Sequence, residues 1–331
     1  MFRTVSIIGD GAMGTVLAML LAEKEIPVRL WGYDPEQLDL FRRSLENKKF
    51  LPGYRISKAV QFESRDDRIL DGADLIISAV PCQYTREIWR RLSSRYREGI
   101  PIVSVSKGIE NKTLLRPSEI LVDILGSGIR YAVLSGPTIA DELARHLPAT
   151  ACVACEDPSL ARDIQYTFNA DWLRVYTNGD VVGVEMAAAC KNVIAIAAGI
   201  IDGVGAGDNA KAALLSRGLA EIGRLGLACG ARPETFAGLA GLGDLVTTCI
   251  SPKGRNRTFG ERIGQGRTTE QALAATESVV EGVTTCESVV TLARQKAVEM
   301  PITEAVYQVI FEHKPVRQAI HDLMSRQLKA E

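Results

Sequence analysis

The chain begins with a pattern that strongly restricts its fold: a short apolar run, glycines at fixed spacing, and then a helical segment. Residues 4–8 are typical of a buried strand, Gly9-Asp10-Gly11-Ala12-Met13-Gly14 follows at once, and residues 15–24 have helical periodicity. In such a unit the first glycine permits a tight turn, the second lets backbone amides approach a pyrophosphate, and the third lets the helix pack on the strand. A glycine-rich core turn is the alternative, but the flanking elements favour a dinucleotide-binding unit.

Strand-like and helical segments alternate over the first half of the chain. The expected strands are residues 26–31, 75–80, 102–106, 131–135, 151–154 and 173–176, with helical segments such as 84–96 and 118–125 between them. This alternation predicts an α/β Rossmann-type fold with a doubly wound parallel sheet. From about residue 178 only helical periodicity remains, over residues 179–223, 235–241, 258–275, 283–296 and 303–328. We therefore expect a dinucleotide-binding domain at residues 1–178 and an all-helical substrate domain at residues 179–331.

The composition and net charge restrict the kinds of molecule that the protein is expected to bind. A formal net charge of −1 without long blocks of one sign argues against nucleic acid and membrane surfaces, so small molecules are the expected partners. No apolar run approaches the roughly 20 residues of a membrane span, and the N-terminal run is too short for a signal peptide, which predicts no membrane insertion and a cytoplasmic protein. The seven scattered cysteines fit reduced thiols, and Cys152 and Cys155 lack a second such pair, so no metal site is expected.

The end of the second expected strand bears on the choice of cofactor. In a Rossmann unit an acid at this place favours NAD and an arginine favours NADP. Here the strand ends in Gly32-Tyr33-Asp34-Pro35 without an arginine, which favours NADH. Asp34 could equally cap the helix that begins at Pro35.

Three polar segments are candidates for a reaction site. Lys107 follows an expected strand, where ligands bind in such sheets, although it could be a solvated loop lysine. Lys191 precedes an apolar helical run, where burial would lower its pKa and suit it to proton transfer, unless its head reaches water. Arg255 and Asn256 could bind a phosphate, or form a charged surface turn.

Taken together, these segments resemble the NAD(P)-dependent glycerol-3-phosphate dehydrogenases of bacterial type, over the full length of the chain. The matching segments are the glycine turn with Thr15, residues 106–110, 135–140, 191–195 with 207–211, and 241–249 with 255–257, followed by 279–283. The resemblance implies reduction of dihydroxyacetone phosphate to sn-glycerol 3-phosphate with NADH or NADPH, which supplies the backbone of phospholipids. It also implies a homodimer.

The resemblance further implies roles for individual residues. Lys191 would be the acid/base, and Lys107 and Asp244 would assist it. The substrate would contact Lys107, Gly136, Thr138, Lys191, Asn192, Asp244, Thr248, Arg255 and Asn256. The cofactor would contact Gly9, Gly11, Ala12, Met13, Gly14, Tyr33, Lys107, Ala140, Arg255, Val279 and Glu281.

Some positions depart from the family pattern. Met13 replaces an aromatic residue and Tyr33 an arginine or histidine, which leaves the preferred cofactor open; Gly254 replaces a serine and Asp141 a lysine. Two other functions remain as alternatives. A hydroxy-acid dehydrogenase of the same plan would need a carboxylate-binding motif, which the early loops lack. A non-catalytic nucleotide sensor would have no use for a proton donor.

Overall fold

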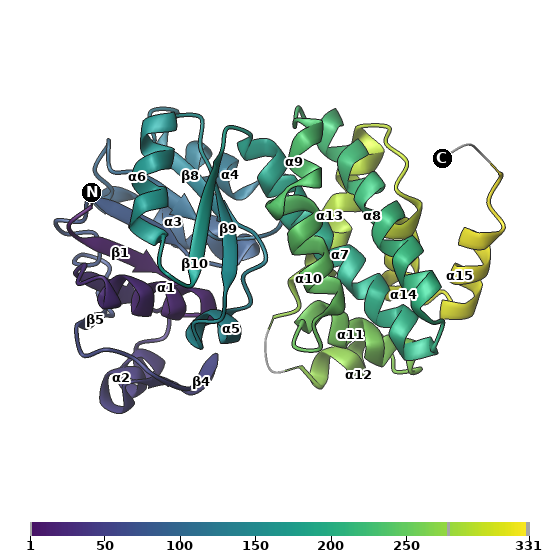
Figure 1. Cartoon of the computed structure of the whole chain (residues 1–331), viewed down its shortest axis with the longest axis horizontal. Coiled ribbons are helices and arrows are strands. Elements are labelled where there is room, and N and C mark those ends of the chain that lie inside the picture. The colour runs from purple at the N-terminus through teal and green to yellow at the C-terminus, as the bar shows by residue number, and fades with distance from the viewer. Residues whose placement is uncertain (1, 277–278, 329–331) are drawn as a thin grey trace. The chain divides into compact units, whose positions relative to one another are not determined.

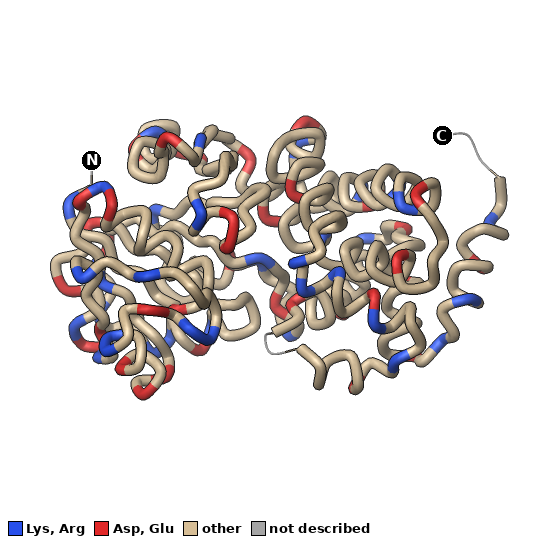
Figure 2. Tube along the Cα trace, turned by 60° about the horizontal axis from the view of Figure 1, so that its bottom comes forward, with Lys and Arg blue, Asp and Glu red and all other residues tan. Residues whose placement is uncertain are grey.

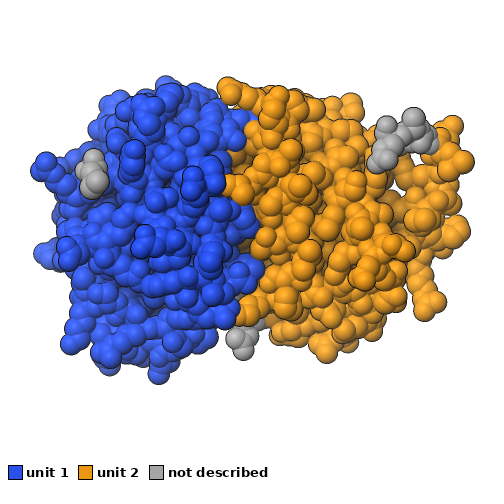
Figure 3. Space-filling model, in the orientation of Figure 1, with its two compact units in different colours: residues 1–107, 115–181 blue, residues 108–114, 182–331 orange. Residues whose placement is uncertain are grey.

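The computed structural model describes residues 2–276 and 279–328, and the chain separates into two compact units (Figure 3). Unit 1 comprises residues 1–107 and 115–181, and unit 2 comprises residues 108–114 and 182–331. Residues 108–114 therefore belong to the same unit as the C-terminal helices. A single division of the sequence at residue 178 does not include this segment in the second unit. The assignment of cofactor binding to residues 1–178 and of substrate binding to residues 179–331 stays a prediction.

Unit 1 is built on an eight-stranded sheet with the order β10-β9-β8-β7-β6-β1-β2-β5. Figure 1 labels β1, β5, β8, β9 and β10 among these strands. Its strands are β1 (Val5–Ile8), β2 (Val28–Trp31), β5 (Val60–Glu63), β6 (Leu75–Ser78), β7 (Ile102–Ser104), β8 (Tyr131–Ser135), β9 (Ala149–Ala154) and β10 (Leu173–Asn178). The chain runs outward from β1 to β2 and β5 and then returns to β6 on the other side of β1. This reversal places the end of β1 at the topological switch point, where such sheets bind ligands.

The expected Rossmann-type sheet is confirmed, with two differences. Strand β9 runs antiparallel to β8, because the connection with its short helix α5 (Ala140–Ala144) returns into the sheet from the edge at which β8 ends. A two-stranded hairpin of β3 (Glu46–Asn47) and β4 (Leu51–Arg55), together with β5, was not expected. These strands are short, and β4 is largely exposed, so they lack the apolar runs that marked the others.

The two faces of the sheet bury separate sets of side chains. Val5 and Ile7 of β1 belong to one apolar cluster and Ile8 to the other. This alternation follows from the two-residue period of a strand, and burial of both faces is typical of a parallel sheet. The helices of this unit are α1 (Ala12–Glu23), α2 (Pro35–Ser44), α3 (Cys82–Leu92), α4 (Pro117–Leu125), α5 and α6 (Pro158–Phe168), with a 3₁₀ turn η1 (Ser93–Arg95).

Unit 2 is helical. Its elements are α7 (Val181–Val204), α8 (Asp208–Ala228), α9 (Pro233–Ala237), a π-helical turn η2 (Leu239–Gly243), α10 (Asp244–Ile250), α11 (Arg255–Gly264), α12 (Thr269–Ala274), α13 (Glu281–Gln295), α14 (Pro301–Phe311) and α15 (Val316–Met324). The segment 108–114 is fastened to α13, since the Ser288 hydroxyl donates to the Ile109 carbonyl at 3.0 Å. Basic and acidic residues are interspersed along the trace of both units (Figure 2).

Helix α7 is the centre of the apolar core of unit 2. It is long and apolar enough to cross a membrane, but 94% of its most apolar window is buried within the protein. Such a helix is apolar on every side because other elements surround it.

Helices α7 and α11 touch backbone to backbone. A Cβ atom added to Gly199 of α7 would lie 1.9 Å from the Arg257 carbonyl oxygen, and one added to Gly260 of α11 would lie 2.0 Å from the Ile196 carbonyl oxygen. Gly203 and Gly264, four residues further along each helix, are also too close for a side chain, since an added Cβ would lie 2.3 Å from the Glu261 and 2.4 Å from the Ile200 carbonyl oxygen. Any larger residue must push these helices apart, so the four glycines set their distance.

We expect Gly260→Ala to destabilise the protein by about 2 kcal/mol or more, because overpacking a closed contact costs more than the better helix propensity of alanine returns. The matched control is Gly223→Ala in α8, where an added Cβ would come no closer than 4.0 Å to Phe236. Gly223→Ala should leave stability unchanged or raise it by up to about 1 kcal/mol. Chemical denaturation measures both variants, and equal behaviour would contradict the contact described.

Candidate active site

The glycine turn after β1 is tightly packed at Gly9 and Gly14 and open at Gly11. Gly9 adopts φ +115°, and an added Cβ would lie 2.5 Å from the Ala79 carbonyl oxygen. A Cβ on Gly14 would lie 2.0 Å from the Gly9 carbonyl oxygen, whereas one on Gly11 would meet nothing within 4 Å. Gly11 is also the N-cap of α1 and provides no side-chain cap. Helix α1 begins at Ala12, so the backbone amides of Ala12 and Met13 could donate to an anion in the open space beside Gly11.

Asn47 holds this turn in place and was not found from the sequence. Its fully buried side-chain amide donates to the Asp10 carbonyl oxygen at 2.9 Å and to the Thr15 hydroxyl at 2.7 Å. Its Oδ1 accepts from the Phe50 amide at 3.0 Å. The β3–β4 hairpin is therefore anchored on the glycine turn. No sequence signal pointed to it, because a single asparagine in a polar stretch has no pattern.

The end of β2 shows which contact Asp34 makes, after the sequence left open both a part in the choice of cofactor and a helix cap. Asp34 is the N-cap of α2, and its Oδ1 accepts from the amides of Glu36 at 3.0 Å and Gln37 at 3.3 Å. The Tyr33 side chain is 60% exposed, and the guanidinium of Arg91 lies over its ring. The capping role, left open by the sequence, is the one observed.

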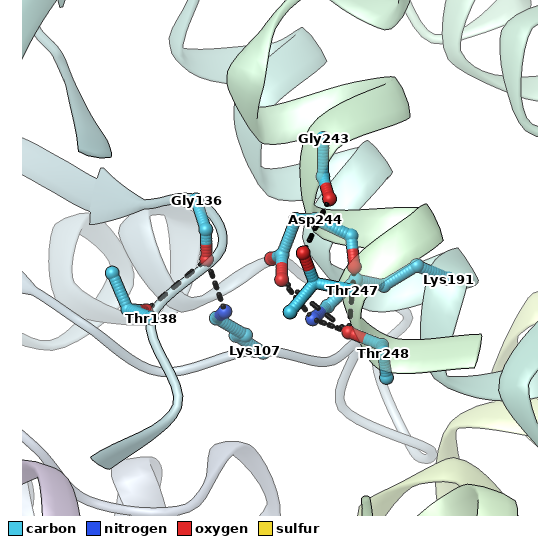
Figure 4. Close-up of polar contacts among 8 residues, drawn as sticks. All are labelled: Lys107, Gly136, Thr138, Lys191, Gly243, Asp244, Thr247 and Thr248. Carbon is cyan, nitrogen blue, oxygen red and sulfur yellow. Dashed lines mark hydrogen bonds and ion pairs between the residues drawn. The ribbon is translucent and has the colours of Figure 1, made fainter. Parts of the chain in front are cut away.

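Lys107, Gly136 and Thr138 form one polar group in unit 1 (Figure 4). Lys107 Nζ donates to the Gly136 carbonyl oxygen at 3.4 Å, and the Thr138 hydroxyl donates to the same oxygen at 3.1 Å. Gly136 adopts φ +140° and directly follows β8. The expected gathering of these residues at the strand ends is therefore observed.

Asp141 has a structural role in this chain. Its Oδ1 accepts from the Tyr54 hydroxyl at 2.6 Å, and it pairs with Arg145 at 3.1 Å. It therefore ties the β3–β4 hairpin to α5, the helix that begins at Ala140. This contact gives the departure at position 141 a physical reason, because a lysine could not accept the hydrogen bond.

Lys191, Asp244 and Thr248 form the second polar group, in unit 2 (Figure 4). Lys191 is 4% exposed, and its Nζ lies 2.5 Å from Asp244 Oδ1 and 2.5 Å from the Thr248 hydroxyl. The Thr248 hydroxyl also donates to the Asp244 carbonyl oxygen at 2.6 Å. Asn192 is buried next to Lys191 on α7. The head of Lys191 therefore does not simply reach water, which was the alternative that the sequence allowed.

A π-helical turn precedes Asp244, and such turns are frequent at functional sites. Gly241 lies in this turn, where a Cβ would fall 2.1 Å from the Phe236 carbonyl oxygen. The glycine-rich sequence of residues 241–244 thus allows α9 to pack closely under the start of α10, which positions the Asp244 carboxylate.

The beginning of α11 gathers four of the expected ligand-binding residues. Asn256 is buried, and its Oδ1 accepts from the Gly282 amide at 2.9 Å. Arg255 donates to the Val279 carbonyl oxygen at 3.2 Å, and Glu281 begins α13. The Asn256 amide nitrogen is therefore the end of this side chain that could donate to a ligand.

Asp202 joins three helices of unit 2 and was also missed from the sequence. Its carboxylate lies 2.5 Å from Lys211 Nζ of α8 and 2.6 Å from a guanidinium nitrogen of Arg257 in α11. All three side chains are at most 20% exposed. An acid near the end of an otherwise apolar helix was the available signal.

Within the described parts of the chain, no three His, Cys, Asp or Glu side chains gather as metal ligands would. Burial raises the pKa of the Cys152 thiol to about 11, and it raises that of Cys155 as well. Neither thiol is therefore tuned for redox chemistry.

Comparison with known proteins identifies the family. Residues 4–161 match the model of the NAD-dependent glycerol-3-phosphate dehydrogenase N-terminus, and residues 180–321 match that of its C-terminus. A glycerol-3-phosphate dehydrogenase [NAD(P)+] of Geobacter sulfurreducens is 46% identical over 333 residues, which cover 100% of this chain and 99% of the relative. The chain belongs to the NAD-dependent glycerol-3-phosphate dehydrogenase family. The resemblance inferred from the sequence is thereby confirmed.

Other members of the glycerol-3-phosphate dehydrogenase family extend the comparison. The enzyme of Chlorobium limicola is 45% identical over 99% of both chains. The crystal structure of glycerol-3-phosphate dehydrogenase from Coxiella burnetii matches with a TM-score of 0.95 at 35% identity, over 98% of this chain and 99% of that one. The Saccharomyces cerevisiae enzyme gives 0.84 at 26% identity, over 98% and 99%. Both units therefore have the family's fold.

Asp10 lies in the glycine turn, and its raised pKa predicts that the stability of the protein depends on pH. Burial raises the pKa of this carboxyl from 3.8 to about 6, and Asp34 adds to the effect, while the backbone and Lys49 partly oppose it. Between about pH 4 and pH 6 only the folded state holds the proton, so the free energy of unfolding falls as the pH rises, by up to about 3 kcal/mol.

Asp10→Asn should remove this slope. We expect the difference in unfolding free energy between the variant and the wild type to shift in favour of the variant from pH 4 to pH 7, as measured by urea denaturation. A constant difference across this range would contradict the raised pKa.

Proposed function

We propose that this chain is an NAD(P)H-dependent glycerol-3-phosphate dehydrogenase, an oxidoreductase that reversibly reduces dihydroxyacetone phosphate to sn-glycerol 3-phosphate and so supplies the glycerophospholipid backbone. The observation that carries this proposal is the buried Lys191, which is hydrogen-bonded to Asp244 and Thr248. A buried ammonium that is hydrogen-bonded to two side chains is better explained as a proton donor than as a residue that only packs. The names of relatives that align over the whole chain support the substrate and the cofactor.

Lys191 is proposed as the acid/base. When bound, a nicotinamide cofactor would supply the hydride that reduces the C2 carbonyl carbon of dihydroxyacetone phosphate. Lys191 Nζ would give a proton to the carbonyl oxygen. In the reverse direction the neutral amine takes this proton from the hydroxyl. Asp244 and Thr248 would hold Nζ in one position, so that little reorganisation is needed during transfer. Lys107 would contribute a second positive charge to substrate binding and contact the cofactor, with Gly136 and Thr138 beside it.

Arg255 and Asn256 are proposed to bind the substrate phosphate. A guanidinium matches phosphate oxygens with parallel N–H donors. Asn256 Oδ1 accepts a hydrogen bond from the Gly282 amide, which fixes the orientation of the side-chain amide. Its nitrogen can then donate to the phosphate. Asn192 is proposed as a further substrate contact from α7.

The cofactor is proposed to bind along the glycine turn, where the space at Gly11 fits a pyrophosphate. The proposed contacts are Gly9, Gly11, Ala12, Met13, Gly14, Tyr33, Lys107, Ala140, Arg255, Val279 and Glu281. The residues that approach this space through their backbone amides need no particular side chain. A backbone contact of this kind is compatible with Met13, where the family pattern often has an aromatic residue.

We further propose a cytoplasmic homodimer without membrane insertion and without a nucleic-acid partner. Burial of α7 supports the absence of insertion, because its apolar surface is already covered by protein. Interspersed charges of both signs support the absence of a polyanionic partner. The dimer rests on the family resemblance alone.

The test of this function follows nicotinamide absorbance with dihydroxyacetone phosphate and NADH or NADPH. The wild type should oxidise a reduced cofactor only when the substrate is present. Lys191→Ala should lower turnover by roughly a hundredfold or more, the scale of losing a general acid, while NADH binding persists. Lys296→Ala, at an exposed lysine of the same unit, is the matched control and should remain active. Folded, NADH-binding wild type without turnover would instead favour a nucleotide sensor or another substrate.

Arg255→Ala should raise the KM for dihydroxyacetone phosphate by roughly tenfold or more, since a charge-assisted hydrogen bond contributes about 1.5–3 kcal/mol. Arg267→Ala, at an exposed arginine after α11, is the control and should leave KM unchanged. Steady-state kinetics at saturating cofactor separates the two. An unchanged KM in Arg255→Ala would move the phosphate site elsewhere.

A further inference from the structure

The Asp10 carboxyl lies at the end of β2, although Asp10 belongs to the glycine turn after β1. A Cβ added to Gly32, the first residue after β2, would lie 2.6 Å from Asp10 Oδ2. The Gly9 amide donates to the Trp31 carbonyl oxygen at 2.9 Å, which ties the glycine turn to the end of β2. The Asp10 carboxyl therefore fills the space that a side chain at position 32 would occupy.

This place is where a Rossmann unit distinguishes its two cofactors. An acid at the end of the second strand accepts a hydrogen bond from the ribose 2′-hydroxyl of NAD, whereas a cation accommodates the 2′-phosphate of NADP. In this chain Asp34 has the expected position in the sequence, but its Oδ1 already caps α2. Asp10 brings a second carboxyl to the same strand end, from a position within the glycine turn itself.

The charged groups around this strand end do not favour a 2′-phosphate. Asp34 and Lys49 are the charges that act on Asp10, one of each sign. Arg91, whose guanidinium lies over the Tyr33 ring, pairs with Asp66 through two nitrogens, and its NH2 group lies 2.9 Å from Asp66 Oδ1. The Arg91 charge is therefore already matched by a carboxylate. With a pKa of about 6, Asp10 is itself an anion at pH 8.

We propose that Asp10 makes the cofactor site selective for NADH over NADPH. Its carboxylate accepts a hydrogen bond from the ribose 2′-hydroxyl of NADH and repels the 2′-phosphate of NADPH, and Asp34 adds to this repulsion. The inference rests on the proposed function, because it requires that a nicotinamide dinucleotide binds along the glycine turn. It makes Asp10 a determinant of cofactor choice, a role that the Rossmann pattern assigns to the end of the second strand.

The test measures binding rather than turnover. Calorimetric titrations with NADH and with NADPH at pH 8, without substrate, give two dissociation constants each for the wild type, Asp10→Asn and Asp163→Asn. Asp163 is an exposed acid on α6, which connects β9 and β10 at the other edge of the sheet from β2, so its variant has the same change in net charge.

We expect the wild type to bind NADH at least about tenfold more tightly than NADPH, as repulsion between close like charges allows. In Asp10→Asn this ratio should fall by about tenfold, with tighter NADPH binding and weaker NADH binding, and in Asp163→Asn it should not change. Asp10→Ser, which also removes the charge, should give the same direction and serves if the asparagine variant does not fold.

The binding data separate a failure of this inference from a failure of the proposed function. A wild type that binds NADPH as tightly as NADH, or a ratio that is unchanged in both Asp10 variants, would overturn this inference and leave the proposed function intact. A folded wild type that binds neither nucleotide would overturn the proposed function and this inference together.

Discussion

The contact of α7 with α11 is the constraint on which the candidate active site depends. Lys191 lies on α7, and Arg255 and Asn256 begin α11, so the distance between these helices sets the distance from the proposed proton donor to the proposed phosphate ligands. Gly199 and Gly260 let the two backbones touch, and side chains of any other size would separate them. Asp202 reinforces the same pair through Arg257. Packing and chemistry are therefore coupled in unit 2.

Close backbone approach also shapes the proposed cofactor site in unit 1. Gly9 lets the glycine turn approach the Ala79 carbonyl after β6, and Gly14 lets α1 approach the Gly9 carbonyl, while Gly11 faces open space. The buried Asn47 also holds the turn, by donating to the Asp10 carbonyl oxygen. In both units a few glycines allow the close approach, and one polar side chain, Asn47 in unit 1 and Asp202 in unit 2, reinforces it. The proposed reactive groups thus lie on rigid supports, which would reduce reorganisation during a reaction.

The parts that could be predicted from the sequence are those with a period or a fixed spacing. The central strands, the glycine turn and the buried helix around Lys191 have such patterns, and the family resemblance covered the rest of the candidate site. The direction of β9 and the anchoring by Asn47 depend on contacts between segments far apart in the chain. The cap made by Asp34 is a local contact, which the sequence offered as one of two roles. No local pattern encodes such contacts, because one asparagine or aspartate can serve equally as a cap, an anchor or a ligand.

The exchange of residues 108–114 has a consequence for the modularity of this protein. The chain passes between the two units three times, at residues 107 and 108, 114 and 115, and 181 and 182. A fragment that ends near residue 178 would therefore carry a piece of unit 2 without α13, and the Ile109 carbonyl would lose its Ser288 partner. The two units therefore cannot be exchanged between relatives as separate segments of sequence. A recombined protein would have to keep residues 108–114 and α13 from the same parent.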